Sequence, residues 1–258
     1  MDWRLKVPLH WLISSAPFSH NVQFAFQRLN GSFPVSDQVL EEKLNNARRH
    51  AAVLEASDDG ILFEFGTGWD LLQPLVMWSL GYRRQVLIDI NPLARVWLVT
   101  DIAQRLRKRG FPSIGPVQRL ADLSFYGIQY LAPADARRTQ LEDGSVRCIV
   151  STSTLEHIPK EDIAAIFREC YRILASAGRM SLIIDHQDHW SYADPSIDRF
   201  NFRRYSTRAW WYLNPPTHWQ NRLQHSDYIT LLENNGFHVT SAEASAEESG
   251  SHIVARKA

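Results

Sequence analysis

Short apolar runs alternate along the chain with longer segments whose apolar residues recur three and four positions apart. The short runs predict strands at residues 61–65, 85–90, 128–131, 146–151 and 179–185. The longer spacing predicts helices at residues 70–80, 92–110, 163–174 and 226–235. Two closing strands, at 237–244 and 252–256, are joined by a polar turn. Because alternating strands and helices need crossover connections, we expect a doubly wound, mostly parallel seven-stranded α/β sheet with an antiparallel last strand and helices on both faces.

Two segments stand outside this pattern and are expected to be caps. Residues 1–57 begin with a stretch rich in Trp, Phe and Pro and end in an amphipathic helix at about 39–55, which Asp58 and the residues after it terminate. Within the sheet domain, 58–258, residues 186–225 form a long aromatic and arginine-rich insert after the fifth strand. Because the insert follows a strand's carboxyl end, we expect it to cover the ligand side of the sheet. The N-terminal stretch is expected either to close over the same side, to pack on the sheet or to make a dimer contact.

Composition narrows the classes of function. Hydrophobic residues make up 45 % of the chain, and 28 basic residues balance 28 acidic ones. This balance disfavours a nucleic-acid binder with a broad basic surface. Cys148 and Cys170 lie in apolar contexts and are expected to be reduced core thiols. With no apolar run of about 18 residues and no signal-peptide pattern, we expect a cytoplasmic protein without a membrane partner.

The stretch FEFGTGWD, residues 63–70, predicts a strand that runs into a ligand-binding turn. Gly66 and Gly68 permit the close approach of backbone N–H groups to a nucleotide-type ligand. Leu71 stands where a dinucleotide fingerprint has its third glycine, and the acidic Glu64 suits a cationic ligand better than a pyrophosphate. The turn therefore favours S-adenosylmethionine over a dinucleotide. Asp89 lies at the end of the second predicted strand and could accept hydrogen bonds from a ribose diol, or else cap the next helix.

Four motifs in order carry a family resemblance: residues 64–68 (EFGTG), Asp89, Asp135 with Ala136, and residues 151–159 (STSTLEHIP). Over about residues 55–185 and 226–258 the chain resembles the class I, seven-β-strand, Rossmann-like S-adenosylmethionine-dependent methyltransferases. The resemblance implies an enzyme with S-adenosylmethionine as cofactor. The family often has a glycine where Asp70 stands, and we expect Asp70 to cap the following helix instead.

The resemblance also implies roles for matching residues. Glu64, Gly66 and Gly68 would line the methionine moiety of the cofactor and Asp89 would bind its ribose. Ile90 would pack against adenine, while Asp135 would contact the adenine amine with Ala136 alongside. Ser151 and Thr152 would lie beneath the methionine end.

Methyl transfer to a hydroxyl or a protonated amine is helped by a base, and three histidines lie close to predicted strand ends. The candidates are His157, which could instead be structural, and His186 and His189 at the start of the insert. The sequence DHQDH at 185–189 could also suggest metal ligands, but it does not match the metal-dependent catechol-type enzymes well, and no metal is expected.

The insert supplies the expected substrate contacts, namely Trp190, Arg203, Arg204, Trp210 and Trp211. The aromatic residues would stack on a flat or sugar-like acceptor, or else anchor the insert. The arginines would clamp a carboxylate or phosphate of the acceptor, or else lie on the surface.

The sequence thus predicts methyl transfer to a small molecule, with O-methylation preferred and N-methylation close behind, in secondary, sugar or natural-product metabolism. A homodimer is possible. The alternatives are an NAD(P)-dependent oxidoreductase and a non-catalytic methyltransferase-like binding protein. Nucleic-acid methylation is disfavoured by the charge balance and by the lack of an Asn/Asp-Pro-Pro-Tyr-type motif after the fourth strand.

Overall fold

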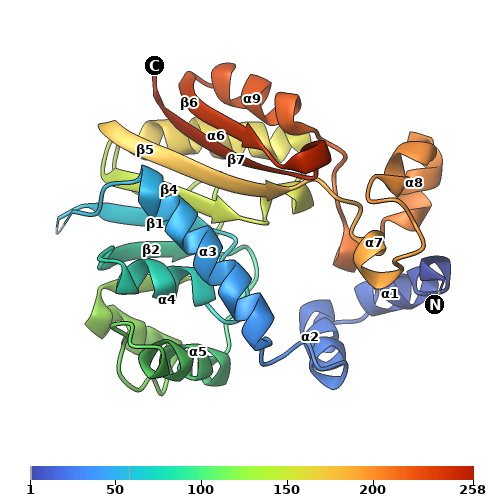
Figure 1. Ribbon diagram of the computed structural model, residues 1–258, viewed down its shortest axis with the longest axis horizontal. Helices are drawn as coiled ribbons and strands as arrows, with labels where there is room; N and C mark the ends of the chain where they lie inside the picture. The colour runs from blue at the N-terminus through green and yellow to red at the C-terminus, as the bar shows by residue number, and fades with distance from the viewer. Residues whose placement is uncertain (1, 58) are drawn as a thin grey trace.

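A single seven-stranded sheet forms the centre of the computed structural model, which describes residues 2–57 and 59–258 (Figure 1). The strands are β1 (Ile61–Phe65), β2 (Arg84–Ile88), β3 (Ile128–Leu131), β4 (Val146–Thr152), β5 (Leu174–Asp185), β6 (Phe237–Ala244) and β7 (Gly250–Lys257). Their order across the sheet is β3-β2-β1-β4-β5-β7-β6. Strands β1 to β5 pair in parallel, whereas β7 runs antiparallel to both β5 and β6. The predicted fold class is confirmed.

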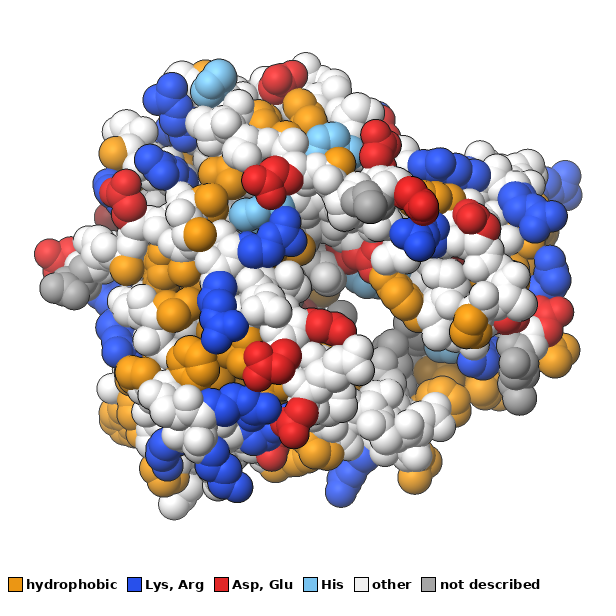
Figure 2. All heavy atoms as spheres, viewed as in Figure 1, with side chains coloured by type: hydrophobic (Ala, Val, Ile, Leu, Met, Phe, Trp, Pro, Cys, Tyr) orange, Lys and Arg blue, Asp and Glu red, His pale blue; other side chains and the backbone are white. Residues whose placement is uncertain are grey.

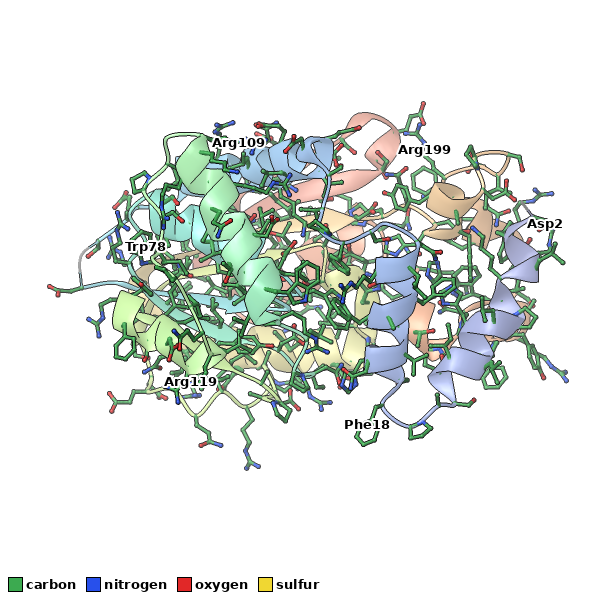
Figure 3. All side chains as sticks on the ribbon, turned by 90° about the horizontal axis from the view of Figure 1, so that it is seen from below. Asp2, Phe18, Trp78, Arg109, Arg119 and Arg199 are labelled. Atoms are coloured by element: carbon green, nitrogen blue, oxygen red, sulfur yellow. The ribbon has the colours of Figure 1, made fainter. Side chains whose placement is uncertain are left out.

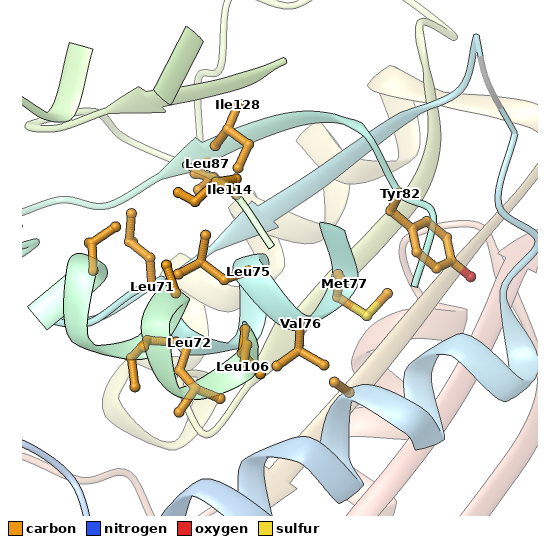
Figure 4. Close-up of a cluster of buried hydrophobic side chains, with 14 of the residues drawn as sticks. Leu71, Leu72, Leu75, Val76, Met77, Tyr82, Leu87, Leu106, Ile114 and Ile128 are labelled. Carbon is orange, nitrogen blue, oxygen red and sulfur yellow. The ribbon is translucent and has the colours of Figure 1, made fainter. Parts of the chain in front are cut away.

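Helices cover both faces of the sheet, as its sequence pattern requires. The helices are α1 (Val7–Ser14), α2 (Ser19–Leu29), α3 (Asp37–Val53), α4 (Leu72–Ser79), α5 (Val96–Lys108), α6 (Lys160–Ile173), α7 (Trp190–Ala193), α8 (Thr207–Leu213) and α9 (His225–Glu233). Side chains of α3, α4 and α5 share one apolar cluster with Leu62 and Leu87 of the sheet (Figure 4). Side chains of α6 and α9 share a second cluster with Phe63 and Phe65. The alternation of residues 62–65 between the clusters explains why β1 is apolar at nearly every position.

Helix α6 shows how the pattern of its residues determines its packing. Ile163, Ile166, Phe167 and Cys170 recur at helical spacing and are all buried. Glu161 and Asp162 occupy the first turn, where carboxylates interact favourably with the positive end of the helix. The helix therefore presents one apolar face to the sheet and leaves its polar face to solvent.

Two helix starts differ from their predicted positions. Helix α4 begins at Leu72 because Leu71 adopts a left-handed conformation, with φ 50°, and occupies the N-cap position expected for Asp70. Asp70 still serves the helix end, because its Oδ1 accepts the N–H of Leu72 at 3.0 Å. Helix α5 begins at Val96 rather than near residue 92, and Arg95 occupies its N-cap position.

Two further element boundaries depend on hydrogen bonds that the periodicity did not reveal, one set between strands and the other at a helix cap. Strand β5 begins at Leu174, which pairs with Val146, rather than at residue 179, so α6 runs directly into the strand. Helix α9 begins at His225, and its N-cap is Gln224. The side chain of Asp227 accepts the Gln224 N–H at 2.8 Å, which completes a capping box.

The N-terminal helices and the insert pack together as a lobe beside the sheet (Figures 1 and 3). The core of this lobe contains Trp3 and Val7 from the N-terminal segment and Trp190, Phe202 and Trp210 from the insert. The N–H of Trp3 also donates to Oδ2 of Asp194 at 3.1 Å. Helix α3, by contrast, packs on the sheet domain, where it contacts α4 and β5. The proposed boundary between residues 57 and 58 stays a prediction, and Asp58 itself lies outside the described residues.

Candidate active site

The turn after β1 has the backbone conformation that the two glycines were expected to allow. Gly66 has φ +74° and Gly68 has φ +71°, both in the left-handed region that favours glycine. A Cβ atom on Gly66 would lie 2.1 Å from Cγ2 of Thr154. The Thr154 hydroxyl also donates to the Gly66 carbonyl at 3.2 Å. The turn after β1 and the loop after β4 are therefore in direct contact.

Asp89 directly follows β2, and its buried carboxylate faces the same turn. Its Oδ2 accepts the Gly68 N–H at 3.2 Å and its Oδ1 accepts the Asn91 N–H at 3.1 Å. Burial raises the pKa of Asp89, and the backbone N–H groups around it partly oppose that shift. Asp89 does not cap α5, because that helix starts seven residues later, at Val96. The carboxylate is thus positioned by β2 and by the glycine turn.

A cavity of about 320 Å³ lies at the carboxyl ends of the parallel strands. Five of the nine residues expected to bind cofactor line it, namely Gly66, Asp89, Ile90, Asp135 and Ala136. The side chain of Ile90 is 62 % exposed and provides an apolar wall of the kind that an aromatic base requires. The Asp135 carboxylate is paired with Arg137, whose Nη2 lies 2.7 Å from Oδ2. The structure therefore brings together residues that are far apart in the sequence.

The other four expected cofactor residues do not line this cavity. Glu64 is 2 % exposed, and its Oε2 has no hydrogen-bond partner among the described residues. Burial raises the pKa of Glu64 to about 8. Ser151 donates to the Phe65 carbonyl at 3.3 Å, and Thr152 shares a hydrogen bond with Nε2 of His50 at 2.9 Å. With Gly68, these residues support the floor of the site and the turn beside it.

A second cavity, of about 480 Å³, lies between the sheet edge and the lobe, where Figure 2 shows the surface hollowed. Its lining comes from α2 and the segment after it, from the loop after β4, from the end of β5 and from the insert: Gln27, Ser32, Ser153, Glu156, His157, Asp185, His189, Tyr192, Ala193 and His218. His157 also lines the first cavity. The two cavities therefore meet at this histidine.

Carboxylates and imidazoles dominate the second cavity. Glu156 is 1 % exposed, and neither of its carboxyl oxygens has a hydrogen-bond partner among the described residues. Burial holds the pKa of Glu156 well above its usual range, and the charge of Asp185 adds to the effect. Oδ2 of Asp185 accepts the Tyr192 hydroxyl at 2.6 Å and lies 3.4 Å from Nε2 of His189. These groups form one connected polar wall.

Two of the three predicted candidate bases lie in this wall. Nδ1 of His157 is 2.8 Å from the Trp219 carbonyl, so it carries the proton and leaves Nε2 with a lone pair. The ring centres of His157 and His189 are 4.8 Å apart. Desolvation by the surrounding atoms lowers the pKa of His157, and the neighbouring His189 lowers it further. His157 is therefore a neutral imidazole near neutral pH.

His186 is placed differently from the other two candidates. It is buried, with Nε2 bonded to Ser251 Oγ at 2.6 Å, and it lines neither cavity. Burial lowers the pKa of His186 to about 4. The expectation that His186 acts as a base is not supported, because its neighbour Asp185 ends β5 towards the cavity while His186 turns into the core.

The insert residues expected to contact substrate line neither cavity: Trp190, Arg203, Arg204, Trp210 and Trp211. Trp190 and Trp210 are buried in the core of the lobe. Trp211 is 61 % exposed and packs against Trp11, and Arg203 lies over the Phe200 ring. The placement of these residues therefore agrees better with the alternatives, in which the aromatic residues anchor the insert and the arginines lie on the surface, than with contacts to substrate. Tyr192 and His218, for which no sequence motif predicted a role, do line the second cavity.

Comparison with known proteins identifies the domain. Residues 66–182 match the family model described as "Methyltransferase domain", which spans the glycine turn, Asp89, Asp135 and the loop after β4. The chain carries a class I methyltransferase domain. The predicted family, enzyme class and S-adenosylmethionine cofactor are thereby confirmed. No curated protein matches the chain.

Solved structures share the fold of this methyltransferase at low identity. A geranyl diphosphate C-methyltransferase from Streptomyces coelicolor has 10 % identity and a TM-score of 0.55, over 88 % of this chain and 86 % of its own. A methyltransferase from Methanosarcina mazei has 18 % identity and a TM-score of 0.53, over 78 % and 93 % of the chains. Mitomycin 7-O-methyltransferase has 17 % identity and a TM-score of 0.52, over 100 % and 69 %. At these identities the likeness is one of fold. Within residues 2–57 and 59–258, no helix is long and apolar enough to span a bilayer.

Proposed function

We propose that this methyltransferase transfers the methyl group of S-adenosylmethionine to a hydroxyl group of a small molecule. The observation that carries the proposal is the position of His157 in the walls of both cavities. Methyl transfer is an in-line displacement, so the donor and acceptor sites must meet at one point where the acceptor, methyl and sulfur atoms align. The junction at His157 is such a point.

The first cavity has the features that the cofactor requires. Asp89 offers a carboxylate to the ribose diol, and Ile90 with Ala136 offers an apolar surface to the adenine ring. Asp135 is the group assigned to the adenine amine, although its pairing with Arg137 leaves fewer of its lone pairs free. Glu64 does not line the cavity, but it is a buried carboxyl group close to the glycine turn, its Oε2 has no hydrogen-bond partner among the described residues, and it favours a ligand that carries positive charge. S-Adenosylmethionine has both a sulfonium and an ammonium group.

The second cavity suits a small polar acceptor. Its volume of about 480 Å³ is within the usual range for sites of small molecules. Its wall contains neutral His157 and also His189, which can accept a proton from a hydroxyl as the methyl group arrives. A primary or secondary amine is the second candidate, because the same imidazole could deprotonate an ammonium group. Two of the solved structures that share this fold are a geranyl diphosphate C-methyltransferase and mitomycin 7-O-methyltransferase, whose named acceptors are both small molecules.

A binding and turnover experiment tests the proposal. Calorimetry should detect S-adenosylmethionine and no NAD, and incubation with a panel of phenols, sugars and amines should release S-adenosylhomocysteine with at least one acceptor. Binding of NAD in place of S-adenosylmethionine would favour the oxidoreductase alternative. Cofactor binding without turnover on the whole panel would favour a binding protein and count against catalysis.

A further inference from the structure

Three side chains in the wall of the second cavity converge in a way that the methyl-transfer chemistry alone does not explain. One ligand-capable atom from each of Glu156, His157 and His189 lies within 4.8 Å of the other two. Glu156 and His157 come from the loop after β4, and His189 comes from the insert. Residues separated by about thirty positions in the chain are thus brought to one point.

We propose that Glu156, His157 and His189 bind one divalent transition metal ion of the zinc type in the wall of the acceptor cavity. Two imidazoles and one carboxylate suit zinc, cobalt or iron(II) better than magnesium or calcium, which prefer oxygen ligands alone. Bonds of about 2.0 to 2.2 Å place the ligand atoms of such an ion about 3 to 4 Å apart, so small side-chain rotations complete the site. Three protein ligands leave a coordination position open to the cavity.

The second, independent observation is the state of Glu156. Its side chain is 1 % exposed and lines the cavity, yet neither of its carboxyl oxygens accepts a hydrogen bond of good geometry among the described residues, and the backbone N–H groups of Glu156 and Asp185 only partly offset its burial. A buried carboxyl group without partners is costly, and an ion at this point would satisfy it. Among the described residues that line the cavity there is no lysine or arginine to take that place.

The two histidines are held as metal ligands usually are. Nδ1 of His157 bonds to the Trp219 carbonyl, and Nε2 of His189 lies 3.4 Å from the Asp185 carboxylate. An oxygen acceptor on one ring nitrogen fixes the tautomer and leaves the other nitrogen unprotonated for an ion. Asp185 is itself held by the Tyr192 hydroxyl at 2.6 Å and the Gln187 N–H at 2.9 Å. The surroundings of the three ligands are therefore already organised.

The role of the ion in activating the acceptor rests on the proposed function, whereas the binding of the ion does not. An ion at this position would take up the free lone pairs of both imidazoles and would replace them as the activating group. It would coordinate the acceptor oxygen and lower the pKa of that hydroxyl, whose proton would pass to solvent in the open cavity, and the oxygen would then displace the sulfur from the methyl group. The acceptor class would then be a hydroxyl compound, and amines would bind less well.

The test measures binding of the metal alone by the full-length chain. Protein stripped of metal by a chelator is titrated with Zn²⁺, Co²⁺ and Mg²⁺ by calorimetry, and Co²⁺ binding is followed by its visible absorption. We expect one Zn²⁺ or Co²⁺ per chain, with weaker Mg²⁺ binding. Glu156→Gln and His189→Ala should each weaken binding by about 100-fold, because loss of a ligand costs at least as much as loss of its supporting contacts. His238→Ala, at an exposed position on β6, should leave the affinity unchanged.

The proposal would be overturned if the protein bound neither Zn²⁺ nor Co²⁺, or if it bound Mg²⁺ more tightly than Zn²⁺. It would also be overturned if Glu156→Gln and His189→Ala bound Zn²⁺ as tightly as His238→Ala does. Circular dichroism establishes that each variant is folded, and His157→Ala replaces Glu156→Gln if the latter is not. If chelator-treated protein still transfers methyl groups at the full rate, the metal has no part in the reaction, and the proposed function still holds. If the protein binds the metal but transfers methyl groups to no acceptor, the metal site holds and the proposed function is wrong.

Discussion

The backbone N–H of Gly68 donates to Oδ2 of Asp89 across 3.2 Å and joins the turn after β1 to the end of β2. This bond orients the carboxylate along the rim of the cofactor cavity. It also depends on the left-handed conformation of Gly68, with φ +71°. Cofactor affinity should therefore depend both on the Asp89 charge and on the glycine backbone.

Asp89→Ala should weaken S-adenosylmethionine binding by about 100-fold, because hydrogen bonds to a charged group contribute roughly 1.5 to 3 kcal/mol. Calorimetry measures the change, and Asp143→Ala is the control, since Asp143 is an exposed carboxylate of a surface ion pair. Equal affinities for Asp89→Ala and the unmodified protein would remove Asp89 from the ribose site.

Gly66→Ala and Gly68→Ala form a matched pair that separates crowding from backbone strain. At Gly68 no described atom lies within 4 Å of an added Cβ, so only the left-handed conformation is strained, at about 1 to 2 kcal/mol. At Gly66 the Cβ also meets Cγ2 and Oγ1 of Thr154 at 2.1 and 2.4 Å. We expect Gly66→Ala to lower the free energy of unfolding by roughly 2 to 4 kcal/mol.

Urea denaturation compares the two glycine variants. Adding Thr154→Ala to Gly66→Ala should recover part of the loss, because it removes the two nearest atoms. Equal destabilisation by the two single variants would show that the contact with Thr154 does not limit this position.

Cofactor affinity should rise with pH up to about 8. Burial raises the pKa of Glu64 to about 8 even though the positive charge of Lys43 opposes the shift, so the group is mostly protonated at neutral pH. A cationic cofactor favours the ionised form and lowers this pKa in the complex, so binding below about pH 8 releases a proton. Calorimetry in buffers of different ionisation enthalpy measures that proton. Glu64→Gln should reduce the release, and an unchanged release in this variant would contradict the role of Glu64.

Turnover should depend on His157 and His189 and not on His186. His157→Ala and His189→Ala should each lower kcat by about 100-fold, the contribution typical of a positioned proton acceptor, with cofactor affinity little changed. His186→Gln, whose amide can replace Nε2 in the hydrogen bond to Ser251, is the matched control. If only the His186 variant loses turnover, the prediction is wrong, and the acceptor does not bind in the cavity that His157 and His189 line.

The fold was predictable because periodicity reports burial directly. Residues 61–65 were expected to form a strand, and β1 has those bounds, since its side chains alternate between two apolar clusters. Helix starts were less predictable, because they depend on local contacts: Leu71 takes a left-handed conformation that no periodicity reveals.

The cofactor side of the site was more predictable than the acceptor side. Asp89 and Asp135 each follow a parallel strand, and such ends meet at one edge of the sheet. The insert was expected to use its tryptophans and arginines, but Trp190 and Trp210 are needed to give the lobe a core. His189 and Tyr192 reach the cavity instead, because the path of the insert beside the sheet brings them there. That path depends on tertiary contacts such as the Trp3 bond to Asp194.

The protein should lose stability as the pH falls below about 6.5, and His50 should account for part of the loss. This histidine of α3 is fully buried, and its ring bonds to Ser181 Oγ at 2.7 Å and to Thr152 Oγ1 at 2.9 Å. Burial, with the neighbouring His252 and Arg49 side chains, lowers the pKa of His50 to about 3.

In the unfolded chain the pKa of His50 is near 6.5, so between about pH 6.5 and 3 the unfolded state binds the extra proton. The stability contributed by neutral His50 is complete above 6.5 and is lost as the pH falls through this window. Urea denaturation at pH 7 and at pH 5 gives the free energy of unfolding that each protein loses between the two conditions. This loss should be about 2 kcal/mol smaller for His50→Gln than for the unmodified protein. His238→Gln, at an exposed site, should lose as much as the unmodified protein. Equal pH-dependent losses in all three proteins would mean that His50 is not the group that takes up the proton on unfolding.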